Sequence, residues 1–469
     1  MAEPTKPVVA RYDAIILGSG QAGNPLASAL SAKGKRTAMI ERAAVGGTCV
    51  NYGCTPTKTL VASAEVAYMA RRALEYGIKV GNVSVDMPAV RERKRGMVKK
   101  WREGSEKRLR EADLVDLIYG EGSFVGPKQV RVRLNDGTER TLTADLIVID
   151  TGLTANIPPI KGLASVPYLD NASVMELGEV PEHMLVLGGG YVGLEFAQML
   201  RRFGSRVTII QNGKQLLAGE DSDIADEVTA ILRQDGVEIL LEANTETAST
   251  TEKGICLSVK VKGESTELAG THLLVAAGRR PNTERLNLAA AGIATDDRGY
   301  VRVNDKLETS APGVYAVGDV NGGPAFTHVS YDDFRVLQTN LLEGGNRSIA
   351  GRLFPYCVFI DPQLGRIGMS ENEAKKQGRK VRVARLPMTS VARAHETGRT
   401  RGFMKALVDA KTEEILGAAV LGAEGGEVMS IIQVAMMGKL KYTALQNAIF
   451  AHPLFAESLN NLFSNFQRE

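Results

Sequence analysis

The sequence predicts an α/β fold with two Rossmann-like domains followed by a C-terminal α+β domain. Three observations lead to this prediction. A strand–turn–helix–strand pattern with three glycines occurs twice, several later apolar runs end at Gly or Asp, and the sequence changes character near residue 353. The repeated pattern places the first two domains in the same structural class.

The repeated pattern covers residues 12–41 and 184–211. Each copy starts with a short apolar run, continues with G-x-G-x-x-G and a stretch suited to a helix, and ends in a second apolar run. The glycines are Gly18, Gly20 and Gly23 in the first copy and Gly188, Gly190 and Gly193 in the second. The first glycine of such a unit makes a tight turn, the second lets a pyrophosphate approach the backbone, and the third lets the helix pack on the strand. Both copies therefore predict a dinucleotide site.

Three later apolar runs, at residues 146–149, 273–276 and 314–317, are expected to be buried parallel strands. They lead into the segments DTG, AAGRRPN and GD, and α/β folds place ligands at this edge of a sheet. From about residue 353 the elements become shorter and no nucleotide fingerprint occurs. The expected domains are a first domain in two pieces, a second Rossmann-like domain and a C-terminal domain, at 11–155 with 283–350, 156–282, and 351–469.

Composition and charge narrow the class of protein. The 469 residues are 44% hydrophobic and 24% charged, as in ordinary globular proteins. The net charge of +3 gives no reason to expect a nucleic-acid partner, and no apolar run reaches the roughly 18 residues of a membrane span. Residues 1–10 are expected to be a flexible tail without the apolar core of a signal peptide, so a cytoplasmic location is expected. Residues 91–110 predict a solvated helix rich in Lys and Arg.

Two of the four cysteines lie close together in GGTCVNYGCTPTK, residues 46–58. Cys49 and Cys54 are five positions apart, about 7.5 Å along a regular helix, whereas a disulfide needs Cα atoms within about 7 Å. A bridge therefore requires a distorted helix or helix entry, for which the neighbouring glycines supply backbone freedom. The N-terminus of the following helix would stabilise a thiolate and favour thiol–disulfide exchange. A metal site is not expected, because zinc sites add a second pair of ligands.

His452 and Glu457, near the C-terminus, form a second candidate pair. A histidine held by a carboxylate can move protons near neutral pH. A single histidine in this position is more often structural, so the pair gains weight only from its context.

GGTCVNYGCTPTK resembles the redox motif of the flavoprotein disulfide reductases, which include dihydrolipoamide dehydrogenase, glutathione reductase and mercuric reductase. The likeness extends over residues 11–469, through both fingerprints, GRRPN, YAVGD and the terminal HPxxAE. GSGQAGNPLA and CTPTKTL are most similar to the mercuric-reductase-like subgroup. The resemblance implies a homodimeric enzyme that binds FAD in its first domain and NAD(P)H in its second, with a C-terminal dimerisation domain.

The resemblance also implies roles for individual residues. Cys54 would face the flavin as the electron-accepting sulfur, and Cys49 would exchange with the substrate. His452, aided by Glu457, would be the acid–base group, supplied across the dimer interface. Further implied catalytic residues are Lys58 paired with Glu195 beside the flavin, and Tyr191 covering the nicotinamide pocket. The implied cofactor contacts, besides the fingerprint glycines, are Glu41 for the adenosine ribose, Asp319 for the ribityl chain, and Thr48, Lys58, Gly122, Gly152, Thr327, Gln211 and Gly278.

Several features depart from the family pattern. Gln211 stands where an acid usually binds the ribose of NADH, which favours NADPH slightly, with Lys214 and Arg206 as candidate partners for its phosphate. No cysteine follows Cys357, so the terminal cysteine pair of mercuric reductases is missing. Cys256 and Cys357 are expected to be inert core residues.

The natural substrate is left open by these features. A stand-alone reductase of small disulfides is preferred. The alternatives are a dihydrolipoamide dehydrogenase with a lipoyl-protein partner, a Hg(II) or Cu(II) reductase, and a flavin-binding interaction protein without turnover.

Overall fold

The computed structural model describes residues 9–252 and 254–467, which form two compact units. Unit 1 comprises Met1–Leu60, Pro88–Asn156 and Gly278–Arg352. Unit 2 comprises Val61–Met87, Ile157–Ala277 and Leu353–Glu469. Each unit therefore joins segments that are distant in the sequence, and the expected boundaries of the three domains stay a prediction.

Unit 1 is organised around a parallel sheet whose strands lie in the order β3, β2, β1, β5, β15. The bounds are β1 (Val9–Leu17), β2 (Thr37–Glu41), β3 (Val115–Gly126), β5 (Glu139–Ile149) and β15 (Val314–Ala316). Ile15 and Ile147 belong to the buried cluster on one face of the sheet, whereas Ile16 and Val148 belong to the cluster on the other. Burial on both faces explains why these strands are continuous apolar runs.

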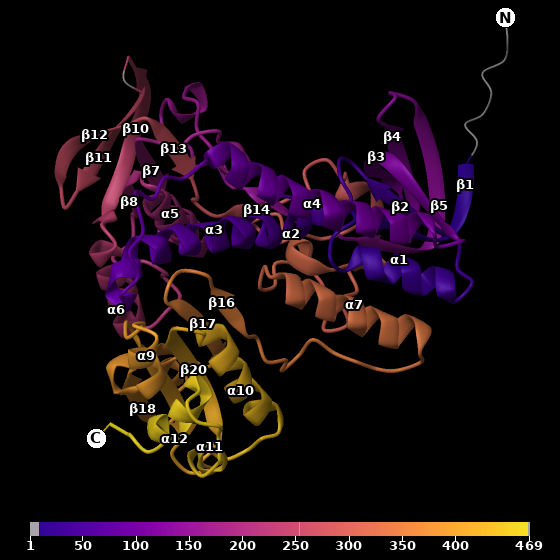
Figure 1. Ribbon diagram of the computed structural model, residues 1–469. Helices are drawn as coiled ribbons and strands as arrows, with labels where there is room; N and C mark the ends of the chain where they lie inside the picture. The colour runs from indigo at the N-terminus through magenta and orange to yellow at the C-terminus, as the bar shows by residue number, and fades with distance from the viewer. Residues whose placement is uncertain (1–8, 253, 468–469) are drawn as a thin grey trace, which may run out of the picture. The chain divides into compact units, whose positions relative to one another are not determined.

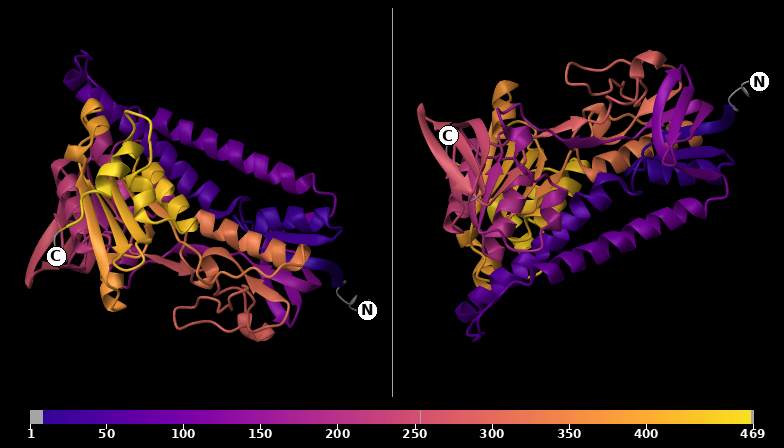
Figure 2. Two further views of the ribbon diagram at one scale, coloured as in Figure 1. Left: turned by 90° about the horizontal axis from the view of Figure 1, so that it is seen from below. Right: turned by 90° about the horizontal axis from the view of Figure 1, so that it is seen from above.

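Different elements cover the two faces of this sheet. Helices α1 (Gly23–Ala32) and α7 (Thr327–Leu342) pack together on one face (Figure 1). On the other face, the far ends of β3 and β5 form an antiparallel meander with β4 (Gln129–Leu134). The remaining elements of unit 1 are α2 (Gly47–Asn51), α4 (Met87–Arg110), β6 (Leu153–Ala155) and β14 (Arg279–Pro281). The long helix α4, visible in both views of Figure 2, confirms the helix predicted for residues 91–110.

Unit 2 contains the second parallel sheet, with strands in the order β13, β7, β8, β9. The bounds are β7 (His183–Leu187), β8 (Arg206–Ile210), β9 (Glu238–Leu240) and β13 (His272–Val275), with helices α5 (Tyr191–Phe203) and α6 (Ser222–Gln234). An antiparallel sheet of β10 (Ala243–Thr251), β11 (Gly254–Val261) and β12 (Glu264–Gly270) packs against it through Leu185, Ile255 and Leu257. The strand–helix–strand order predicted for residues 184–211 is therefore confirmed.

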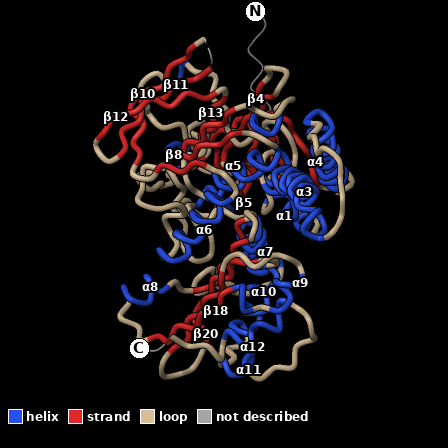
Figure 3. Tube along the Cα trace, turned by 60° about the vertical axis from the view of Figure 1, so that its left-hand side comes forward, coloured by secondary structure: helices blue, strands red, loops and turns tan. Residues whose placement is uncertain are grey.

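A five-stranded antiparallel sheet forms the C-terminal part of unit 2, in the order β16, β17, β20, β19, β18. Figure 3 labels β18 and β20 of this sheet, with α10, α11 and α12 beside them. The strands are β16 (Tyr356–Val358), β17 (Gln363–Gly368), β18 (Val381–Pro387), β19 (Phe403–Asp409) and β20 (Ile415–Gly422). The helices are α8 (Glu371–Lys376), α9 (Ala392–Glu396), α10 (Gly425–Met437), α11 (Tyr442–Gln446) and α12 (Ser458–Leu462). The mixed strands and helices confirm the α+β character predicted for this region.

Short 3-10 helices complete the description, at Ala73–Tyr76, Leu163–Ser165, Ser173–Glu176, Leu288–Ala291, Gly318–Asn321, Met388–Ser390 and Phe455–Glu457. Helix α3 (Cys54–Arg72) runs from unit 1 into unit 2. Val9 and Ala10, which the sequence assigned to a tail, are the first residues of β1, and residues 1–8 of that tail lie outside the described residues. Between residues 9 and 467, residue 253 apart, no helix is long and apolar enough to cross a membrane. The cytoplasmic location stays a prediction.

Candidate active site

The loop of the first fingerprint lies against the start of the cysteine motif, and both belong to unit 1. A Cβ atom on Gly47 would lie 2.9 Å from the Cα of Gly20, so the backbone of Gly20 leaves no room for a side chain at Gly47. The amide of Gly46 donates to the carbonyl of Ser19 (3.1 Å), and the side chain of Gln21 donates to the carbonyl of Gly46 (3.0 Å). The expected dinucleotide site and the two cysteines are therefore neighbours.

The helix that carries the cysteines is interrupted between them. Helix α2 ends at Asn51, α3 begins at Cys54, and Tyr52 and Gly53 form the break. A Cβ on Gly53 would lie 2.9 Å from the carbonyl oxygen of Thr48, so this break is too tight for a larger residue. The distortion of the helix entry that the cysteine spacing required is confirmed. The pairing of Cys49 with Cys54 as a disulfide stays a prediction.

The two thiols lie on either side of the break between α2 and α3 and differ in exposure, since Cys49 is half-buried and Cys54 is exposed. The exposed Sγ of Cys54 lies 3.3 Å from Oγ1 of Thr327, the first residue of α7, so two helix N-termini meet at this sulfur. The hydrogen bond to Cys54 raises the pKa of Cys49, burial raises it further, and Thr327 and Lys58 oppose the shift. The two thiols therefore titrate as one hydrogen-bonded pair. Thr48, Lys58 and Thr327 all contact or influence this pair, and their implied role in lining the flavin site stays a prediction.

The first fingerprint has the features of a dinucleotide site. Glu41, at the end of β2, accepts hydrogen bonds from the amide (3.1 Å) and hydroxyl (2.6 Å) of Ser19. Asp319 pairs with Arg279 at 2.9 Å. Gly152 has a φ of +64° and open space where a Cβ would point, and the neighbouring hydroxyl of Thr151 is buried without a hydrogen-bond partner among the described residues. Open backbone and an unsatisfied donor beside the strand ends fit a bound dinucleotide.

Sequence reasoning missed Asp150, the residue directly after β5. Its Oδ2 accepts a hydrogen bond from the amide of Gly23 at 2.7 Å. A Cβ on Gly20 would lie 2.7 Å from the same carboxylate, and a Cβ on Gly23 would lie 2.8 Å from it. The signal available in the sequence was an ionisable residue that directly follows a buried strand and precedes a glycine.

The second fingerprint repeats the turn in unit 2. A Cβ on Gly188 would lie 2.4 Å from the carbonyl oxygen of Ala276, and a Cβ on Gly190 would meet only open space within 4 Å. Tyr191 is the first residue of α5, beside this opening. Oε1 of Gln211 accepts from the amide of Gly189 at 3.0 Å, so the amide side chain lies at the fingerprint.

The candidate phosphate partners of the second site are at opposite ends of β8. Lys214 is exposed and follows Gln211 at the carboxyl end of the strand. Arg206 is the first residue of β8. It lies four positions, or about 13 Å, before the last residue of the strand, Ile210, and pairs with Glu238 at 3.3 Å. Arg206 is therefore not a partner for a phosphate beside Gln211, and only Lys214 fits that part of the sequence prediction.

Some predicted site residues are not brought together by described contacts. Lys58 belongs to unit 1 and Glu195 to unit 2, so their pairing stays a prediction. Glu195 is 4% exposed and accepts from the amide of Phe359 at 2.8 Å. Gly122 lies within β3, where a Cβ would be 2.7 Å from Cδ2 of Leu17, and its implied cofactor contact stays a prediction. Gly278, with a φ of +98°, has open space where a Cβ would point.

His452 and Glu457 do lie together in unit 2. Nδ1 of His452 lies 2.9 Å from one carboxylate oxygen of Glu457 and 3.1 Å from the other. A carboxylate partner places the proton on Nδ1 and leaves Nε2 as the nitrogen that can accept one. The imidazole is 66% exposed, so it is presented at the surface of the chain.

The other two cysteines are in strands, as predicted, but they are half-buried and not core residues. Cys256 lies in β11, where burial raises its pKa with a smaller contribution from Glu267. Cys357 lies in β16. Neither has a second cysteine beside it in the described residues, so neither offers a redox pair.

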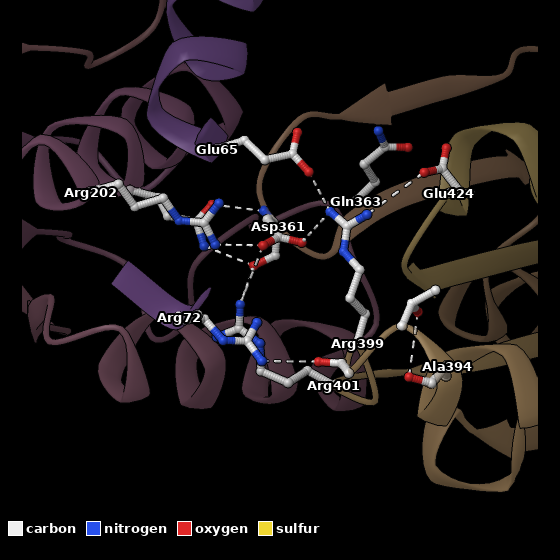
Figure 4. Close-up of polar contacts among 12 residues, drawn as sticks. Glu65, Arg72, Arg202, Asp361, Gln363, Ala394, Arg399, Arg401 and Glu424 are labelled. Carbon is white, nitrogen blue, oxygen red and sulfur yellow. Dashed lines mark hydrogen bonds and ion pairs between the residues drawn. The ribbon is translucent and has the colours of Figure 1, made fainter. Parts of the chain in front are cut away.

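A network of buried charges in unit 2 surrounds Asp361 (Figure 4). Oδ2 of Asp361 lies 2.5 Å from Arg202 and 3.6 Å from Arg401, and Oδ1 lies 3.5 Å from Arg399. Asp235 adds a second carboxylate, 2.5 Å from Arg401. At the edge of the network, Arg399 also pairs with Glu65 (2.6 Å) and Glu424 (3.8 Å).

Comparison with known proteins assigns the chain to one enzyme family. A family model described as pyridine nucleotide-disulphide oxidoreductase matches residues 12–333, and the dimerisation domain of that family matches residues 354–463. The chain is 39% identical to the probable pyridine nucleotide-disulfide oxidoreductase RclA of Escherichia coli, over 97% of this chain and 99% of that one. A solved structure described as the Cu(II) complex of the HOCl-induced flavoprotein disulfide reductase RclA has a TM-score of 0.89 at 38% identity, covering 97% of this chain and 99% of that chain.

Two further relatives have different names. A mercuric reductase of Staphylococcus aureus is 32% identical over 98% of this chain and 83% of its own length. A dihydrolipoyl dehydrogenase of Chlorobaculum tepidum is 31% identical over 96% of both chains.

Proposed function

Because the chain belongs to the pyridine nucleotide-disulphide oxidoreductase family, we propose that it is a stand-alone reductase that passes electrons from NAD(P)H to a small disulfide through Cys49 and Cys54. Like its family, it is an FAD- and NAD(P)H-dependent oxidoreductase that acts on a sulfur group. The observation that carries the proposal is the hydrogen-bonded thiol pair on either side of the break between α2 and α3, against the first fingerprint.

FAD, when bound, would supply a two-electron carrier between the nicotinamide and the thiols. The residues that would hold it are in unit 1. Glu41 would bind the adenosine ribose, Asp319 the ribityl chain, and the backbone of Gly20 the pyrophosphate at the N-terminus of α1. Thr327 would keep the sulfur of Cys54 at the flavin side of the pair, since its hydroxyl already contacts that sulfur.

The thiols would complete the reaction by two exchange steps. Cys49 attacks one sulfur of the substrate disulfide, which forms a mixed disulfide and releases the first substrate thiol. Cys54 then attacks the sulfur of Cys49, which closes the Cys49–Cys54 bond and releases the second substrate thiol. The raised pKa of Cys49 means that a base has to remove its proton before the first step. Nε2 of His452 is the proposed base, and the same nitrogen returns the proton to the leaving thiolate.

We propose that the partner subunit of a homodimer supplies this histidine. Several large apolar side chains of the dimerisation region are exposed on the single chain: Val434, Met437, Leu440, Ile449 and Leu454. Ile449 is fully exposed and lies three residues before His452. An apolar surface of this kind is expected to be covered in an assembly.

Introducing charges into this surface should separate the subunits. We expect the double variant Val434→Asp, Ile449→Asp to elute with the mass of one chain in light-scattering chromatography, whereas the native protein elutes with twice that mass. Disulfide reductase activity should fall with dimer content, because the histidine then has no partner site. Val125→Asp, which changes an exposed valine in unit 1, is the matched control and should stay dimeric. A native protein with the mass of one chain would contradict the proposal.

We propose NADPH as the preferred coenzyme, because Gln211 lacks the charge that repels a 2′-phosphate and Lys214 lies on the same side of the second site. Gln211→Glu should lower kcat/KM for NADPH relative to NADH by about tenfold or more, the value of one charge-assisted contact. Lys214→Gln should shift the ratio in the same direction. Arg206→Gln, at the far end of β8, should leave the ratio unchanged, and equal ratios in all four proteins would refute the assignment.

The substrate class is tested by a panel of acceptors with both coenzymes. Small disulfides, lipoamide, Hg(II) and Cu(II) are compared with the purified yellow protein. Turnover restricted to lipoamide would replace our proposal by a dihydrolipoamide dehydrogenase. Turnover of metal ions is the second candidate, since one relative is a mercuric reductase and a solved structure of another is described as a Cu(II) complex. Against it, the described residues hold no group of three or more His, Cys, Asp and Glu that could bind a metal ion.

A further inference from the structure

Asp150 is the feature of the FAD site that the reaction does not explain. Its carboxylate is buried, with 7% of the residue exposed, and Oδ2 is the nearest atom to a Cβ built on Gly20 (2.7 Å) or on Gly23 (2.8 Å). Oδ2 accepts from the amide of Gly23, the first residue of α1. An acid therefore occupies the helix N-terminus on which a dinucleotide pyrophosphate is expected to lie.

The second fingerprint shows that the turn itself does not need this acid. Asp150 donates its amide to Leu17 at 2.8 Å, and Ala276 donates its amide to Leu187 at the same distance. A Cβ on Gly18 would meet the carbonyl oxygen of Asp150 at 2.3 Å, and a Cβ on Gly188 would meet that of Ala276 at 2.4 Å. The two residues therefore occupy matching backbone positions, and only the first site carries a carboxyl group there.

The surroundings of Asp150 oppose negative charge. Burial raises its pKa well above the ordinary carboxyl value, and the carboxylates of Asp319, Asp333 and Glu41 raise it further, against the amide of Gly23. Two of these neighbours have cations of their own, since Asp319 pairs with Arg279 (2.9 Å) and Asp333 with Arg352 (2.7 Å). Glu41 is held by the amide and hydroxyl of Ser19. A pyrophosphate with two negative charges would add to the repulsion.

We propose that Asp150 is a positioning residue that makes FAD binding proton-linked: the protein takes up one proton at Asp150 when the pyrophosphate lies on α1. The protonated side chain fills the space beside Gly20 without repelling the phosphates, whereas the ionised side chain competes with them for the amides of α1. FAD therefore raises the proton affinity of Asp150. The affinity of the protein for FAD is constant at a pH where Asp150 is protonated without FAD, and it falls once the pH exceeds the pKa that Asp150 has without FAD. The proposal rests on FAD as the cofactor and not on the choice of disulfide substrate.

The test follows FAD release from the purified holoprotein. Samples at a fixed low concentration are equilibrated between pH 5.5 and 9.5, and free FAD is measured by its fluorescence after filtration. We expect the dissociation constant of the native protein to rise with pH, by up to about tenfold per pH unit for one linked proton. Asp150→Asn, which keeps the shape without the ionisable proton, should hold FAD with the same affinity across the range. Asp150→Ala, the residue found at the matching position of the second site, should also give a flat profile.

Calorimetry supplies the second readout. FAD is added to protein stripped of flavin, in two buffers of different ionisation enthalpy, and the difference in heat counts the protons bound. Uptake approaching one proton in the native protein and none in Asp150→Asn supports the proposal. A flat native profile, or the same pH dependence in native and Asp150→Asn proteins, overturns it. A purified protein without flavin would instead contradict the cofactor assignment, which separates the two failures.

Discussion

Replacing Cys54 with serine should abolish disulfide reduction while leaving FAD in place. Serine keeps a hydrogen-bonding group beside Thr327, but an alcohol cannot form a disulfide with Cys49, so electrons have no route from the cofactor to the substrate. We expect kcat to fall by roughly 10⁴-fold, as when one member of a catalytic unit is removed. The flavin content per chain should stay at the native value, because the residues proposed to hold the cofactor are unchanged.

Thiol labelling distinguishes this loss from misfolding. Adding NAD(P)H to the oxidised native protein should expose two alkylatable thiols, at Cys49 and Cys54, together with a long-wavelength absorption from the Cys54 thiolate beside the flavin. Cys54→Ser should show neither response. Cys357→Ser, which alters a half-buried thiol in β16, is the matched control and should behave as the native protein does. The native long-wavelength absorption and native turnover in Cys54→Ser would contradict the proposed electron transfer through Cys54.

Removing the charge of Asp361 should destabilise unit 2 strongly. The carboxylate lies among Arg202, Arg399 and Arg401, and Asp235 is the other carboxylate at the centre of this network. Arg202 is 5% exposed, so it cannot recover its hydration when its partner is lost. We expect Asp361→Asn to lower the free energy of unfolding by about 3 kcal/mol, the usual cost of an uncompensated buried charge. Urea unfolding, with hydrogen exchange of segments 198–202 and 363–368, measures the effect and locates it.

The pH dependence of this effect has a definite sign. Burial would raise the pKa of Asp361, but Arg202 and the two other arginines outweigh burial and lower it. A lowered folded-state pKa contributes stability that is present above the ordinary carboxyl value of about 3.9 and is lost as the pH falls through the folded value. The native protein and Asp361→Asn should therefore converge in stability at acid pH.

Glu424→Ala is the control variant. It removes a half-exposed partner 3.8 Å from Arg399 and should lower the free energy of unfolding by no more than about 0.5 kcal/mol. An equal loss in both variants would contradict the prediction.

The elements that sequence reasoning predicted best are those specified by local spacing. Gly18 to Gly23, the apolar runs on either side of them and the five-residue separation of Cys49 and Cys54 are short-range patterns, and each dictates one turn or one distortion of a helix. The break at Gly53 followed from the geometry of a disulfide alone. The pairing of His452 with Glu457 was also within reach, since the two residues lie in one short segment.

The features that sequence reasoning missed depend on contacts between distant segments. Asp150 accepts a hydrogen bond from Gly23, and its pKa is raised by Asp319 and Asp333. These three residues come from three other elements. The ion pairs of Arg399 are made with Glu65, Asp361 and Glu424, which come from distant parts of the sequence. Arg206 was a candidate phosphate partner by charge, but four positions along a strand carry it to the wrong end. Charge and proximity in sequence do not determine such positions, because the fold decides which ends of the strands meet.

The contact between Gly20 and Gly47 has a consequence for how catalysis can be controlled. Both residues belong to unit 1, together with Cys54 and Thr327, so the residues proposed to hold the flavin and the sulfur proposed to face it lie in one compact unit. A change confined to unit 2 would alter the proposed nicotinamide site, at Gly188 to Gly193, and leave the proposed flavin contacts of unit 1 as they are. Inhibitors or mutations that loosen unit 2 are therefore expected to slow coenzyme oxidation, while the electron step inside unit 1 keeps its native rate.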